Sequence, residues 1–162
     1  MQEIEMIIEE KVKHYGRERK ALLPILRGIV LHKNYISQND MVCVARALDI
    51  SAADVYGTAS FFHLLGNKET GKYVIRVCKS ITCEMKGKHK VLKALEDELR
   101  IQLGETTHDK LFTLEATNCI GLCDEGPAML INNTPYTRLD PEKVHEIIYE
   151  FRNKNKKNHG QQ

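Results

Sequence analysis

Apolar residues recur every three to four positions along the chain as far as about Leu65, which is the periodicity of amphipathic helices. Ser37 and Ser51 precede two of these stretches and are typical N-cap residues. Pro24 is tolerated only in a first helical turn, so the second helix should begin near Leu22. Helices are therefore predicted over residues 3–14 and 22–31, from Ser37 to Leu48, and from Ser51 to Leu65.

After the polar run that ends at Gly71, the pattern changes to short runs of β-branched, aliphatic and aromatic residues, which are typical of strands. Asn132 and Asn133 separate two such runs, as in a hairpin. Asp140 before Pro141 is a strong signal for the start of a helix. The predicted elements are strands over 73–77, 111–116, 128–131 and 135–138, a helix over 84–103 with Gly104 as its C-cap, and a last helix after Asp140.

The order strand, helix, strand, strand, strand, helix matches a thioredoxin-like α/β sandwich. The predicted fold class is therefore α+β, with an N-terminal helical bundle followed by a thioredoxin-like α/β domain. The predicted divisions are residues 1–70, residues 71–152, and residues 153–162 as a flexible tail, because lysines among Asn, Gly and Gln are typical of a frayed end.

The composition is that of an ordinary globular protein, with 42% hydrophobic residues, 28% charged residues and a net charge of +2. No apolar run approaches the length of a spanning helix, so direct membrane insertion is not expected. The acidic start of the chain lacks the pattern of a signal peptide, which predicts a cytoplasmic location and reduced cysteines. Near-neutral charge argues against nucleic-acid binding.

Four of the five cysteines form two close pairs. Cys78 and Cys83 are separated by four residues at the end of a predicted strand, and Cys119 and Cys123 are separated by three residues after another. Soft thiolate ligands suit iron, and a 2Fe-2S cluster needs two thiolates on each iron. The two pairs therefore favour one 2Fe-2S cluster, and Gly121 between the second pair permits the tight bend that such a loop needs.

Alternatives remain open on the residues alone. A structural zinc site would also use four cysteines, although zinc knuckles usually have two residues between ligands. A thioredoxin-type redox dithiol also favours two intervening residues, and neither cysteine pair has that spacing. The helical region joined to a metal-sensing domain would suit a DNA-binding regulator, but it has no basic recognition helix.

Cys43 lies on the apolar side of a predicted helix and is interpreted as a buried structural thiol outside the site. Tyr56, Phe61 and Phe62 are interpreted partly as a subunit interface.

Several motifs occur together in one order: the run Val55–Phe62, then Gly71-Lys72-Tyr73, Cys78 with Cys83, Lys86-Gly87, and Cys119-Ile120-Gly121-Leu122-Cys123. This set resembles the thioredoxin-like 2Fe-2S subunit of bacterial NADH dehydrogenase, respiratory complex I. The same subunit type occurs in NAD-linked hydrogenases, including electron-bifurcating ones, and in NAD-dependent formate dehydrogenases. The likeness extends from about Leu22 to Phe151.

The resemblance implies that Cys78, Cys83, Cys119 and Cys123 are the cluster ligands and that the N-terminal helical region binds a flavin-bearing partner. It implies that FMN and NAD(P) lie on that partner subunit, that further iron-sulfur subunits complete a hetero-oligomeric complex, and that this chain transfers electrons without being an enzyme alone. Within complex I the chain would lie peripherally on the inner face of the membrane. Asp124 and Glu125 stand where many relatives have small or apolar residues.

Overall fold

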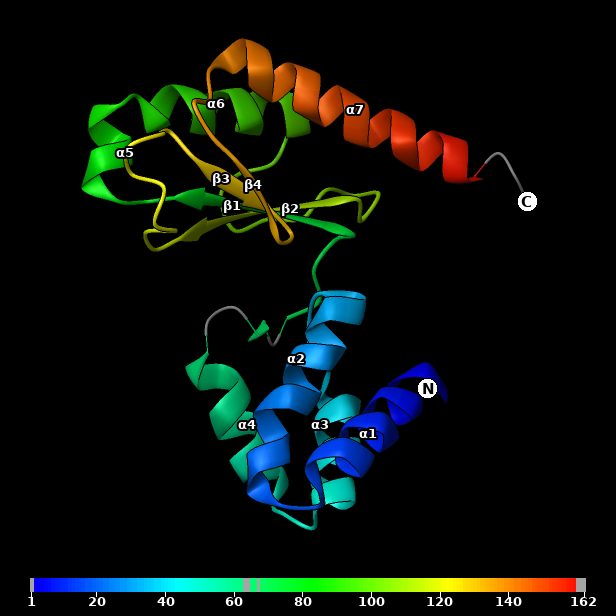
Figure 1. Cartoon of the computed structure of the whole chain (residues 1–162). Coiled ribbons are helices and arrows are strands. Elements are labelled where there is room, and N and C mark those ends of the chain that lie inside the picture. The colour runs from blue at the N-terminus through cyan, green and yellow to red at the C-terminus, as the bar shows by residue number, and fades with distance from the viewer. Residues whose placement is uncertain (1, 63–64, 67, 160–162) are drawn as a thin grey trace. The chain divides into compact units, whose positions relative to one another are not determined.

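The computed structural model describes residues 2–62, 65–66 and 68–159 of the chain. The chain divides into two compact units, Met1–Thr70 and Gly71–Gln162, each of which is described by itself (Figure 1). Helices form the first unit, and helices with a sheet form the second. The predicted α+β class is confirmed. Among the described residues, no helix combines the length and apolar character needed to cross a bilayer.

The first unit is a bundle of amphipathic helices around one apolar core. Its elements are α1 (Gln2–Tyr15), the 3-10 turn η1 (Arg19–Ala21), α2 (Leu22–Lys33), α3 (Gln38–Leu48) and α4 (Ala52–Phe61). Ile25, Ile29, Val44 and Val55 are completely buried in this core. Because these apolar positions follow the helical period, each helix turns one stripe inward and leaves its charged residues in water.

N-caps fix where α3 and α4 begin, as predicted. The Ser37 side chain accepts a hydrogen bond from the Asp40 N–H, and Asp40 in turn accepts from the Ser37 N–H at 2.7 Å, which completes a capping box. Ser51 accepts from the Asp54 N–H at 3.1 Å. Burial alone would raise the pKa of Asp40. Its hydrogen bonds with Lys33 and Ser37, together with the ion pair with Lys33, outweigh burial and hold that pKa below the usual range.

The second unit contains a four-stranded sheet in the order β2-β1-β3-β4. The central strand β1 pairs parallel with β2 and antiparallel with β3, and β3 pairs antiparallel with β4. The β3–β4 hairpin confirms the predicted turn at Asn132 and Asn133. The elements of this unit are β1 (Tyr73–Cys78), α5 (Ile81–Met85), α6 (Lys88–Leu99), β2 (Phe112–Thr117), β3 (Met129–Ile131), β4 (Thr134–Tyr136) and α7 (Pro141–His159).

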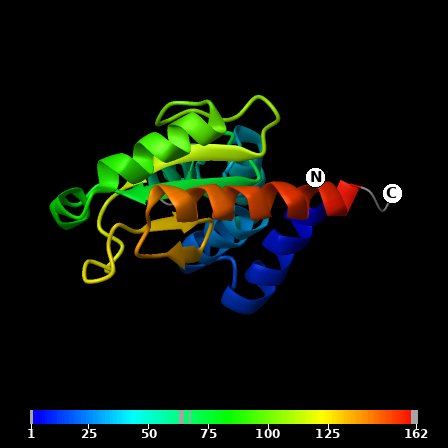
Figure 2. The same cartoon turned by 90° about the horizontal axis from the view of Figure 1, so that it is seen from above.

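Helices α6 and α7 lie side by side on one face of this sheet (Figures 1 and 2). Leu95 of α6 and Ile148 of α7 are completely buried in the same core as Ile75 of β1 and Leu114 of β2. The start of α7 is as predicted, because the Asp140 side chain accepts a hydrogen bond from the Lys143 N–H at 2.8 Å.

Several predicted boundaries differ from those of the structure. The single helix over 84–103 is two helices, because Gly87 adopts a left-handed φ of 91°, and the second helix ends before the left-handed Arg100 rather than at Gly104. The fourth helix ends at Phe61 because Phe62 is extended, and residues 63–64 of the predicted helix lie outside the described residues. Residues 153–159, expected in the flexible tail, continue α7, where Asn155 accepts a hydrogen bond from Lys72 at 2.9 Å.

Gly71 starts the second unit at a point where β2 leaves no space for a side chain. A Cβ there would lie 3.0 Å from backbone atoms of Lys110, Leu111 and Phe112. Gly71→Ala should therefore lower the free energy of unfolding by about 1–3 kcal/mol. The matched variant Gly57→Ala, inside α4 with nothing within 4 Å of its Cβ, should raise it by about 0.5–1 kcal/mol. Urea unfolding of both variants checks the opposite signs.

Candidate metal centre

The parallel pairing of β1 and β2 brings both cysteine loops to one edge of the sheet. Cys78 is the last residue of β1 and is in register with Thr117, the last residue of β2. The Lys79 N–H donates to the Thr117 carbonyl at 2.9 Å just beyond this point. Because parallel strands end at the same edge, the segments that follow them start side by side. Figures 1 and 2 both place α5 and the loop after β2 at that end of the sheet.

The first cysteine pair is buried around the N-cap of α5. Cys78 is 1% exposed and Cys83 is 0% exposed. Ser80 caps the helix, because its hydroxyl oxygen accepts from the Cys83 N–H at 3.4 Å and lies 3.3 Å from Cys78 Sγ. Burial would raise the pKa of the Cys78 thiol, but hydrogen bonds from Ser80, Cys83 and the Ile120 backbone outweigh burial and lower it.

The second pair lies nearer to solvent in the loop after β2. Cys119 is exposed and Cys123 is half-buried, and their sulfur atoms are 3.1 Å apart. Gly121 makes the bend between them with a left-handed φ of 83°, and its N–H donates to Cys119 Sγ at 3.4 Å. The hydrogen bond with Cys119, then burial, then the charges of Cys119, Cys83 and Cys78 raise the pKa of the Cys123 thiol.

The two pairs meet at one site. All four thiols are free, and Cys123 interacts electrostatically with the other three. Gly126 allows the loop after Cys123 to lie close to Cys83, because a Cβ at position 126 would lie only 3.1 Å from Cys83 Sγ. Within the described residues, no three His, Cys, Asp or Glu side chains form a group that could hold a single metal ion. The structure therefore gathers the predicted residues as two sulfur pairs, whereas their role as ligands stays a prediction.

This donor set fits a 2Fe-2S cluster. Each pair supplies two sulfur donors, which is the number that each iron of the cluster needs. The backbone N–H groups of Gly121 and Ile120 already form hydrogen bonds with the sulfur atoms of Cys119 and Cys78, as is common around such clusters. The missing Cβ of Gly126 leaves the space beside Cys83 free.

Two contacts near the site were not found from the sequence. Ser80 stands three residues before Cys83, which is the spacing of an N-cap and could have been recognised. Lys86 donates from its ammonium to the Asp124 carbonyl at 2.6 Å, and no local sequence signal indicates that contact. Cys43, predicted to be a buried structural thiol outside the site, is in the helical unit and half-buried against its core.

Glu125 is engaged in the loop after the second pair. Its carboxylate accepts from Arg138 at 3.0 Å and from the Thr137 hydroxyl at 2.9 Å. The Glu125 carbonyl also accepts from the Arg138 N–H at 2.7 Å. Arg138 therefore offsets the negative charge of Glu125 close to the site.

Comparison with known proteins matches this geometry to one family. The family described as Thioredoxin-like [2Fe-2S] ferredoxin matches residues 8–152. One subunit of the NADH-quinone oxidoreductase of Escherichia coli strain K12 is 34% identical over 145 residues, covering 90% of this chain and 87% of the relative. The corresponding subunit of Buchnera aphidicola subsp. Acyrthosiphon pisum is 33% identical over 145 residues, covering 90% of each chain.

Among solved structures, a chain of an NAD+-reducing [NiFe]-hydrogenase in the air-oxidized state superposes with a TM-score of 0.67 at 26% sequence identity. The match covers 72% of this chain but only 20% of the hydrogenase chain. The relatives are thus subunits or parts of oxidoreductase complexes. With a family match over most of its length and relatives at about one-third identity, the chain belongs to the thioredoxin-like [2Fe-2S] ferredoxin family.

Proposed function

We propose that this chain is an electron-transfer subunit that holds one 2Fe-2S cluster through Cys78, Cys83, Cys119 and Cys123. The observation that carries the proposal is the gathering of four free thiols, in two pairs, at the shared edge of β1 and β2. Such a cluster supplies one-electron chemistry when it is bound. The similarity to the matched subunit of NADH-quinone oxidoreductase supports the same role.

The protein's own residues prepare the thiols for ligation. Metal binding requires deprotonated cysteines, and the hydrogen bonds that Cys78 receives from Ser80 and Ile120 favour its thiolate form. Burial of Cys78 and Cys83 keeps water from one side of the site. Cys119 is exposed, so the other side of the site reaches the protein surface. That exposure suits electron exchange with another chain.

The proposed partner is a subunit that carries FMN and NAD(P), within a hetero-oligomeric complex that also contains further iron-sulfur subunits. The relatives are named as a subunit of NADH-quinone oxidoreductase and as an NAD+-reducing [NiFe]-hydrogenase, which supports a multisubunit oxidoreductase as the setting. The partner would handle hydride transfer in two-electron steps, and this chain would supply the one-electron carrier. The chain by itself is therefore proposed to be non-catalytic.

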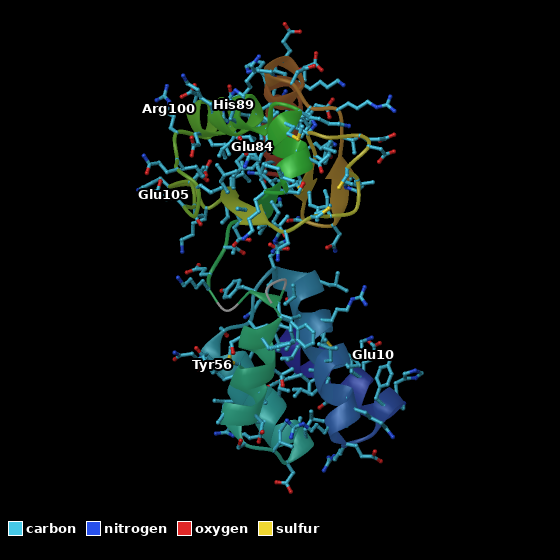
Figure 3. All side chains as sticks on the ribbon, turned by 90° about the vertical axis from the view of Figure 1, so that its left-hand side faces the viewer. Glu10, Tyr56, Glu84, His89, Arg100 and Glu105 are labelled. Atoms are coloured by element: carbon cyan, nitrogen blue, oxygen red, sulfur yellow. The ribbon has the colours of Figure 1, made fainter. Side chains whose placement is uncertain are left out.

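The helical unit is proposed to bind that partner. Tyr56 and Phe61 of α4 and the adjacent Phe62 are 55%, 79% and 41% exposed, respectively, and Figure 3 shows Tyr56 on the outside of α4. Large exposed aromatic side chains are enriched at the centres of protein interfaces. These three exposed aromatic side chains of α4 and the residue after it are therefore the best candidate for the contact surface.

Removing these aromatic side chains should release the partner. The double variant Tyr56→Ser, Phe61→Ser should lower recovery of a co-purified flavoprotein at least about tenfold, because interface aromatics often contribute about 2 kcal/mol or more. Tyr149→Ser, at a position 60% exposed on α7, is the matched control and should retain the flavoprotein. Flavin fluorescence of the purified assembly measures the difference. Equal loss in both variants would contradict the assignment of the surface.

Metal analysis tests the cluster directly. Anaerobically purified full-length protein should be red-brown, contain about two iron and two acid-labile sulfide per chain, and give an EPR signal only after reduction. Removing the iron with a chelator should bleach the colour. A colourless protein with one zinc per chain would overturn the proposal and support a structural zinc site instead.

A further inference from the structure

Lys86 joins the two cysteine loops. It is the C-cap residue of α5, and its backbone N–H bonds to the Thr82 carbonyl at 3.2 Å. Its ammonium donates to the backbone carbonyl of Asp124 at 2.6 Å, across 38 positions of sequence. Asp124 directly follows Cys123. A side chain fixed to the helix of Cys83 thus bonds to the main chain of the loop that carries Cys119 and Cys123.

The stem of Lys86 also lies against that loop. A Cβ added at Gly126 would stand 3.4 Å from Lys86 Cδ and 3.1 Å from Cys83 Sγ. The backbone at Gly126 therefore has the lysine stem and the Cys83 thiol as its close neighbours. The loop is held against α5 by packing along the lysine stem and by a charge-assisted hydrogen bond at its end.

We propose that Lys86 is a positioning residue, which fastens the loop of Cys119 and Cys123 to the helix of Cys83 and so sets the separation of the two sulfur pairs. This inference rests on the proposed function, since it assigns Lys86 a role toward the cluster. Two cysteines of the site are in a loop near solvent, since Cys119 is exposed and Cys123 is half-buried. A link from the rigid helix restricts that loop before any cluster binds.

The test compares four full-length proteins: wild type, Lys86→Met, Lys86→Arg and Lys79→Met. The methionine variant keeps the stem but loses the ammonium, whereas arginine keeps both charge and donor. Lys79 is exposed and adjacent to Cys78, so its variant controls for the loss of one positive charge near the site. Each protein is reconstituted with iron and sulfide, and the loss of visible absorbance is followed in excess chelator.

Lys86→Met should bleach about tenfold faster than wild type, as is usual when a group that orients metal ligands is removed. Lys86→Arg should restore a rate near that of wild type, and Lys79→Met should stay within about twofold of it. Equal rates for Lys86→Met and Lys79→Met would overturn the inference. So would a fall in the unfolding temperature of metal-free Lys86→Met, because the role would then be general folding.

A measurement without iron separates this inference from the proposed function. In the metal-free proteins, amide hydrogen exchange over residues 118–126 should be several-fold faster in Lys86→Met than in Lys86→Arg and wild type. If wild type binds no iron, the proposed function fails, and the exchange result still decides whether Lys86 holds the loop. If wild type binds a cluster but exchange and bleaching are unchanged, only the inference fails.

Discussion

Replacing Cys119 by Ser is expected to remove most of the iron and sulfide from the purified protein while leaving the fold intact. Cys119 is exposed, so its thiol contributes little to the core. Serine has nearly the same size, but its hydroxyl is a hard donor that remains protonated at neutral pH, whereas a cluster needs soft thiolates. Cys83→Ser should have the same effect on the cluster, with some added loss of stability because that side chain is completely buried.

Cys43→Ser is the matched control for both variants. Cys43 is half-buried against the core of the helical unit, which does not contain the proposed ligands. Its iron and sulfide content should equal that of wild type. Iron, sulfide and visible absorbance are measured per chain after identical purification. Similar losses in Cys43→Ser and Cys119→Ser would show that the ligand set is wrong.

The strands and the cysteine pairs could be predicted because the signals are local. The run Tyr73–Cys78 is β-rich over its whole length, and residues of this type are buried when both faces of a strand are covered. The position of Cys78 at the end of one strand and of Cys119 just beyond another was visible in the sequence. The pairing of those strands in parallel then follows from the helices between them, since parallel neighbours need a long crossover.

The errors fall where long-range contacts or rare backbone conformations decide the outcome. Arg100 ends α6 in a left-handed conformation, which a residue with a Cβ seldom adopts and which periodicity does not reveal. The break at Gly87 was hidden because Glu84 and Val91 both suit a helix. The contact between Lys86 and Asp124 joins distant parts of the chain, so it emerges only from the folded unit.

The chemistry of the site depends on the sheet beneath it. The last residue pair of the β1–β2 ladder, Cys78 with Thr117, fixes the distance at which the two loops begin. A slip of the register by one residue would turn every side chain of one strand to the other face. The buried side chains of β2 that hold this register, such as Phe112 and Leu114, therefore influence the position of the cysteine loops without touching them.

Phe112→Ala should be among the most destabilising substitutions in the second unit. Phe112 is 1% exposed, is in register with Tyr73 at the start of β1, and its ring centroid lies 5.6 Å from that of Tyr73. Truncating a buried phenylalanine removes its apolar burial and leaves a cavity, which typically costs about 3–5 kcal/mol. Domains are stable by only about 5–15 kcal/mol, so this loss would remove a large share of the stability of the unit.

Phe61→Ala provides the matched control, because Phe61 is 79% exposed and its truncation should change stability by no more than about 0.5 kcal/mol. Denaturant unfolding of the metal-free proteins is followed by amide hydrogen exchange, so that residues 73–152 are read separately from the helical unit. In Phe112→Ala the protection of residues 73–152 should fall while that of α2 and α3 persists. Because cluster binding favours the folded unit, reconstitution should recover part of the lost stability. Equal amide protection of residues 73–152 in Phe112→Ala and Phe61→Ala would contradict this prediction. It would mean that the packing of Phe112 in β2 against β1 does not support the strands from which the cysteine loops begin.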